Sequence, residues 1–119
     1  MGFLGQLTNL FSRSGRDDNR LRQAMDHAHA NCPEKAIAIY DSLLSGKAAG
    51  PTLQARALFN RALAHSSMKD DLKAIVDLEK VVAMPAAPEN VLAAARNQLV
   101  RVRNRVQRAR DRARGSEVA

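Results

Sequence analysis

The sequence has few aromatic residues and little else that is typical of β-sheet proteins. It holds three Phe, one Tyr and no Trp among its 119 residues, and alanine, leucine, valine and arginine dominate instead. This composition favours helices that pack closely through small residues over a β-sandwich, whose strands are enriched in aromatic and β-branched residues. A chain of this length suffices for one domain with a modest core.

Two further absences bear on the cellular compartment of the protein. The single cysteine, Cys32, excludes an intramolecular disulfide and favours a reducing compartment. The N-terminus lacks the cationic start and the long apolar run of a secretory signal, and no run approaches the roughly 18 apolar residues of a membrane span. We therefore expect a cytoplasmic protein.

The sequence also lacks a recognisable catalytic or metal-binding arrangement. It has no glycine-rich phosphate loop, and His27, His29 and Cys32 are the one group that resembles metal ligands. His27 and His29 are two positions apart on a predicted helix and face different directions, and no fourth ligand accompanies them. A nucleophilic Cys32 with a histidine base has no more support. We expect no enzymatic activity, no metal and no cofactor.

Positive charge is what the sequence has in excess, and the excess lies at the C-terminus. The net charge is +7. Residues 1–95 hold 11 Lys or Arg against 10 Asp or Glu, whereas residues 96–119 hold 8 Arg against 2 acidic residues. An anionic partner would therefore bind at the C-terminal segment.

Apolar spacing and capping residues predict helices along the whole chain. We expect helices over residues 3–11, 18–30, 33–45, 52–67, 71–83 and 88–114. Residues 12–15 are expected to form a hinge. These elements predict an amphipathic N-terminal helix with its linker (1–16), a helical domain (17–105) and a basic C-terminal helical extension (106–119).

An internal repeat relates two of the predicted helix pairs. Aligning Ala36 with Ala74 gives an offset of 38 residues. The same offset pairs Ala24 with Ala62, Tyr40 with Leu78 and Leu43 with Val81. The small residues allow the two antiparallel helices of each hairpin to approach closely.

These segments resemble tetratricopeptide repeats. The stretches LFNRALAH (58–65), DDLKAI (70–75) and DLEKVVAMP (77–85) look like one repeat, and residues 31–44 look like the second half of an earlier one. Residues 88–105 are more loosely similar to the start of a third. The resemblance implies an all-α helical-hairpin fold of about two repeats, with an amphipathic N-terminal helix and a long basic capping helix at the C-terminus.

The resemblance also implies a concave groove lined by the first helix of each hairpin. The groove residues would be Arg22, Met25, His29, Phe59, Asn60, Leu63, Ser67, Asn97, Val100 and Asn104. Apolar side chains would form pockets and Asn side chains would pair with a peptide backbone. We therefore expect a non-catalytic adaptor or scaffold that binds a peptide or helix of a partner protein. The alternative is that a neighbouring segment buries these positions.

The last predicted helix carries a heptad seam flanked by arginines. The seam consists of Leu92, Ala95, Leu99, Val102, Val106, Ala109 and Ala113. Its first half would cap the repeats, and its alanine-rich second half would project, fray or pair weakly with a second copy as a homodimer.

The arginines beside the seam support two interpretations. Arg101, Arg105, Arg108 and Arg112 share one face of the helix and form either a solvated surface or an anion-binding site. In the second case the chain would be a basic nucleic-acid-associated protein. No aromatic residue interleaves with these arginines, so such binding would be non-specific and made through phosphates.

The N-terminal apolar stripe likewise has two interpretations. Residues 3–11 would either dock on the repeats, as a plug in the groove, or lie on a membrane surface. We favour docking. Gly2 does not indicate myristoylation, because Gln6 stands where serine or threonine is needed.

Overall fold

The computed structural model describes the backbone of residues 2–46 and 50–118, and the side chains of residues 15–46 and 50–116. In these ranges the chain forms five α-helices and no strand, which confirms the all-α prediction. The helices are α1 (Gly2–His29), α2 (Pro33–Ser45), α3 (Pro51–Ser67), α4 (Asp71–Val82) and α5 (Glu89–Val118).

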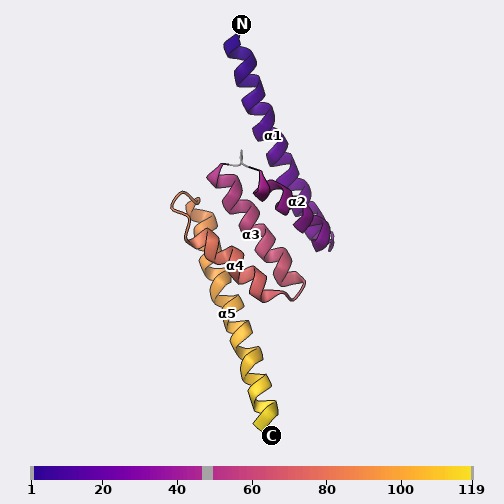
Figure 1. Cartoon of the computed structure of the whole chain (residues 1–119), viewed down its shortest axis with the longest axis vertical. Helices are drawn as coiled ribbons and strands as arrows, with labels where there is room; N and C mark the ends of the chain where they lie inside the picture. The colour runs from indigo at the N-terminus through magenta and orange to yellow at the C-terminus, as the bar shows by residue number, and fades with distance from the viewer. Residues whose placement is uncertain (1, 47–49, 119) are drawn as a thin grey trace.

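The helices stack in chain order into an elongated molecule of 76 × 30 × 20 Å. Each helix packs on the next, and in addition α1 contacts α3 and α3 contacts α5. The N-terminal part of α1 projects from one end of the stack and the C-terminal part of α5 projects from the other (Figure 1). The odd-numbered helices therefore share one side of the stack.

The structure corrects the prediction of a hinge near the N-terminus. Residues 12–15 are helical, and α1 continues from Gly2 to His29 without a break. Nothing lies within 4 Å of the position that a Cβ on Gly15 would take. A single glycine lowers the stability of a helix by only about 1 kcal/mol relative to alanine. Residues 12–15 also include no proline that would break the helix. The predicted apolar stripe at residues 3–11 lies outside the described side chains, as do its two proposed roles.

The two hairpins have the same turn, displaced by the predicted offset. Asn31 and Lys69 both adopt a left-handed backbone with φ 62°. The backbone hydrogen bonds that close the two turns also match. The N–H of Cys32 donates to the carbonyl of His27 (2.8 Å), and the N–H of Asp70 donates to the carbonyl of His65 (2.9 Å). These bonds satisfy carbonyls at the helix C-terminus, so the internal repeat extends to backbone geometry.

Close helix contacts occur at the paired small residues. Ala24, Ala36 and Ala74 are 0% exposed and Ala62 is 1% exposed. Larger residues one turn further along α2 and α4 fill the space between hairpins, and Tyr40 and Leu78 are both fully buried. Alanine allows the backbones to approach because it has no side chain beyond Cβ, which leaves the core to a few large residues.

The last helix closes the stack along the first half of its seam. Ala95, Leu99 and Val102 are buried in one cluster with residues of α3 and α4. Leu92, the predicted first residue of the seam, is only half-buried, and Val91 takes its place in the cluster. Val106 is half-buried, and Ala109 is exposed. The helix therefore leaves the body of the molecule near Val106. None of the described helices is both long and apolar enough to span a bilayer.

We predict that Lys69→Gly stabilises the protein. Glycine adopts a positive φ without the Cβ clash that lysine suffers, and the larger entropy of the unfolded glycine chain offsets only part of this gain. The free energy of unfolding should rise by about 0.5–1 kcal/mol in urea titrations followed by circular dichroism. Lys80→Gly, on the exposed side of α4, is the control and should lower it by a similar amount. Equal losses in the two variants would contradict the role of the turn.

Candidate functional site

A pocket of about 220 Å³ opens between α1 and α3, with α2 behind it. It is lined by Met25, Ala28, His29, Tyr40, Asn60, Leu63, Ala64 and Ser67. Because α1 and α3 are the first helices of the two hairpins and contact each other, the pocket lies on the side where the resemblance places the groove.

Helical spacing explains which side chains meet there. On α1 the pocket is lined by Met25, Ala28 and His29, and on α3 by Asn60, Leu63, Ala64 and Ser67. Residues three and four apart lie on the same face of a helix. Met25, His29, Asn60, Leu63 and Ser67 are among the groove residues that the resemblance implies, and the structure brings them together in one pocket.

The polar side chains at the pocket mouth are held by their own helices. His29 Nδ1 lies 2.7 Å from the carbonyl of Met25, and Asn60 Nδ2 donates to the carbonyl of Arg56 over 2.8 Å. Ser67 Oγ donates to the carbonyl of Ala64 over 2.7 Å. These bonds fix the orientation of the side chains and leave His29 Nε2 and Asn60 Oδ1 available for a ligand.

Tyr40 is the most informative residue of the pocket. Its side chain is fully buried, yet its hydroxyl has no hydrogen-bond partner among the described residues. Burial raises the pKa of Tyr40 to about 12, so the hydroxyl remains a neutral donor. An unpaired buried hydroxyl is unfavourable, and this one is closed off from solvent, so a ligand acceptor could pair with it only after the pocket lining shifts.

The other predicted groove residues lie elsewhere. Arg22 is exposed on α1 outside the pocket lining. Phe59 packs against the core formed by α3, α4 and α5. Asn97, Val100 and Asn104 lie on an exposed face of α5. The described lining of the pocket therefore comes from α1, α2 and α3.

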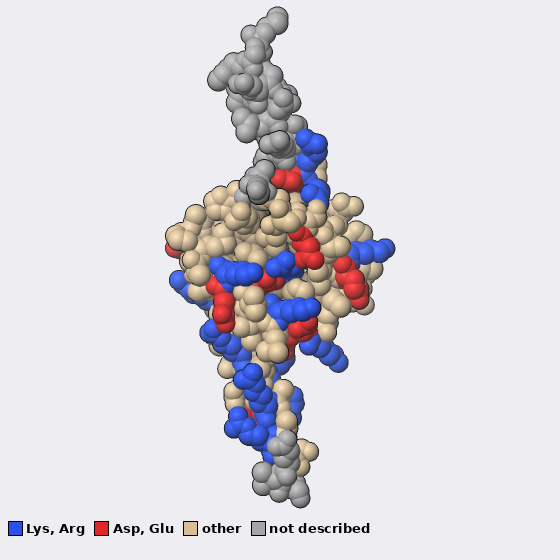
Figure 2. Space-filling view, in the orientation of Figure 1, with Lys and Arg blue, Asp and Glu red and all other residues tan. Residues whose placement is uncertain are grey.

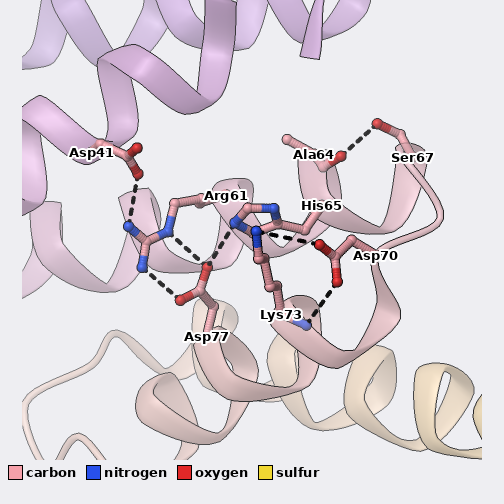
Figure 3. A network of polar contacts seen from close by, with 8 residues as sticks. All are labelled: Asp41, Arg61, Ala64, His65, Ser67, Asp70, Lys73 and Asp77. Carbon is pink, nitrogen blue, oxygen red and sulfur yellow. Dashed lines mark hydrogen bonds and ion pairs between the residues drawn. The ribbon is translucent and has the colours of Figure 1, made fainter. Parts of the chain in front are cut away.

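A polar network that the sequence did not indicate joins α2, α3 and α4 (Figure 3). Arg61 donates from Nε and Nη2 to both carboxylate oxygens of Asp77 (2.8 and 2.7 Å) and from Nη1 to Asp41 (2.9 Å). His65 Nε2 lies 4.0 Å from Asp77. The side chain of Asp77 is 3% exposed and that of Arg61 is 19% exposed.

The Arg61 network is structural in character. The hydrogen bond with Asp77 raises the pKa of Arg61 further above its usual range, and both oxygens of Asp77 are occupied by the guanidinium. Fork-to-fork pairing of this kind is strong and fixes geometry. The network therefore holds the second hairpin against α2.

The predicted anion-binding arginines divide into two groups. Arg101, Arg108 and Arg112 are exposed, whereas Arg105 donates to Asp71 at the start of α4 over two distances of 2.9 Å. This pairing lowers the pKa of Asp71. Figure 2 shows Lys and Arg gathered on the projecting end of α5, while both signs alternate on the body of the molecule.

His27, His29 and Cys32 remain separate in their contacts. Cys32 precedes α2 and directs Sγ to the carbonyl of Ala30, and His29 turns Nδ1 to its own helix. Across the described residues, no three His, Cys, Asp or Glu side chains are grouped so that they could hold a metal ion.

We predict that Arg61→Met lowers the free energy of unfolding by about 3 kcal/mol or more, because it leaves the Asp77 carboxylate buried without its partner. Adding Asp77→Leu should recover much of the loss. Arg103→Met is the control, since it breaks an exposed pair with Glu79 and should change stability by less than about 1 kcal/mol. Denaturant titrations of the three variants measure these differences, and equal losses for Arg61→Met and Arg103→Met would show that the network is not buried.

We also predict that Tyr40→Phe stabilises the free protein by about 0.5–1 kcal/mol, because it removes a buried hydroxyl that has no protein partner. The thermal midpoint of the ligand-free chain should rise. A loss of more than about 1 kcal/mol would mean that the hydroxyl forms a native hydrogen bond.

No protein-family model, no curated protein and no solved structure matches this chain. The resemblance to tetratricopeptide repeats therefore depends on the residues that carry it, and function must be inferred from the pocket and the surface.

Proposed function

We propose that the protein is a non-catalytic, tetratricopeptide-like interaction module that binds an extended peptide or a helix of a partner protein between α1 and α3. The repeated hairpins, with matching turns at Asn31 and Lys69, support the repeat part of this proposal. In addition, α1 contacts α3, and α3 contacts α5. These contacts support a binding surface that the odd-numbered helices form together on one side of the stack.

The size of the pocket favours one side chain of a larger ligand. Small-molecule sites commonly enclose roughly 300–1,000 Å³, and this pocket measures about 220 Å³. A peptide that inserts one side chain here would run across the exposed ends of α1 and α3. Peptide-recognition sites of this kind combine apolar walls with a few polar groups that fix orientation.

The lining of the pocket between α1 and α3 is the observation that carries the proposal. Tyr40 lines the pocket together with Met25, Leu63 and Ala64, and its buried hydroxyl, which has no partner among the described residues, would pair with a ligand acceptor only if the lining shifts on binding. The lining residues include no Lys, Arg, Asp or Glu. The inserted side chain is therefore uncharged.

The exposed arginines of α5 support a second candidate function, that of a basic nucleic-acid-associated protein. Arg101, Arg108 and Arg112 are open to solvent, and phosphate contacts need no base stacking. The two candidates use different surfaces, so they are separable by mutation.

We predict that peptides selected on the full chain from a displayed library of random peptides lose at least about tenfold in affinity with Ala28→Trp. The indole would fill the pocket from α1. Ala38→Trp is the matched control, because Ala38 lies on the exposed side of α2 and its replacement should leave binding unchanged. Fluorescence anisotropy measures the dissociation constant of the peptide for each of the two variants. If no selected peptide distinguishes the two variants, the pocket is not a peptide site.

A further inference from the structure

A second, larger hollow lies where α5 leaves the body of the molecule. It encloses about 750 Å³ between the α3–α4 turn, the start of α4 and the projecting end of α5. We call it the notch. It is lined by Ser66, Ser67, Lys69, Asp71, Leu72, Arg105, Val106, Ala109, Arg110, Arg112 and Ala113.

The floor of the notch is apolar and faces solvent. Leu72 is 61% exposed, and it lines the notch together with Val106, Ala109 and Ala113, which continue the seam of α5 beyond the core. In a folded chain with a modest core, such a continuous apolar strip beside polar residues is typical of a protein interaction site.

The rim of the notch is positively charged. Lys69, Arg110 and Arg112 surround the apolar floor. The one acidic side chain of the described lining, Asp71, is held by Arg105 from both Nε and Nη2 at 2.9 Å, which neutralises it. An occupant of the notch therefore meets a net positive field.

The charge distribution opposes a second copy as the occupant. Residues 96–119 carry 8 Arg against 2 acidic residues, so two projecting helices that paired along their seams would bring like charges together. Nucleic acid would be attracted by the rim, but phosphate contacts make no use of Leu72 or of the seam. An occupant that uses both features has an apolar stripe flanked by carboxylates.

The geometry points to the notch as a binding site for an acidic amphipathic helix of a partner protein, which lays its apolar face on Leu72 and the seam and places its carboxylates against Lys69, Arg110 and Arg112. This is helix-in-groove recognition with charge complementarity at the rim. The site does not depend on the pocket between α1 and α3, so either can exist without the other.

The experiment selects displayed random helical peptides on the full chain and measures the best binders by fluorescence anisotropy. Enriched peptides should have apolar residues at positions i, i+3 or i+4, and i+7, flanked by Asp or Glu. The double variant Arg110→Glu/Arg112→Glu and the single variant Leu72→Gln should each weaken them at least about tenfold.

Two controls of the same chemistry lie outside the notch. Arg96→Glu/Arg101→Glu makes an equal charge change on exposed residues of α5, and Val76→Gln changes an apolar side chain of α4 that is 52% exposed. Both should bind the acidic amphipathic peptides within about twofold of the unchanged chain, and so should Ala28→Trp, which blocks only the other site.

The proposal is overturned if no enriched peptide is acidic and amphipathic, or if the notch variants and their controls bind equally. It is also overturned if single-stranded oligouridylate binds more tightly than any selected peptide and is insensitive to Leu72→Gln, because the arginines would then act as a phosphate-binding arm.

Discussion

The close approach of helices at alanine is the constraint on which the rest of the structure depends. Ala24, Ala36, Ala62 and Ala74 are all essentially inaccessible, so each hairpin closes with backbones near one another. A larger side chain at any of these points would separate the helices and open the space that Tyr40 and Leu78 now fill. The pocket between α1 and α3 exists because the stacking of the hairpins leaves a gap in front of Tyr40.

The two hairpins share a backbone but not their polar chemistry. Asp77 in α4 stands where α2 has Ile39, and Arg61 in α3 stands where α1 has Gln23. The second hairpin therefore has a saturated buried ion pair, while the first has an unsatisfied hydroxyl at Tyr40.

Features that depend on the local order of residues could be predicted from the sequence. Features that depend on how the helices pack on one another were missed. The helices from α2 to α5 and the repeat offset follow from apolar spacing, prolines and paired alanines. The continuity of α1 was missed because a lone glycine among polar residues resembles a linker. The Arg61 network was missed because its three carboxylate and guanidinium groups come from three helices, and their meeting depends on tertiary packing. Five of the pocket residues follow from the resemblance to tetratricopeptide repeats, but the notch requires the angle at which α5 departs.

The packing order of the helices has a consequence for how the molecule gains and loses structure. All the packed pairs join helices that are adjacent or next but one in the chain, so native contacts close short stretches of polypeptide. Such low contact order is associated with rapid folding, and a linear stack behaves as a row of coupled units whose ends open before its middle. Protection from hydrogen exchange is therefore expected to be greatest in α3, which contacts all four other helices, and to decline toward both ends of the chain.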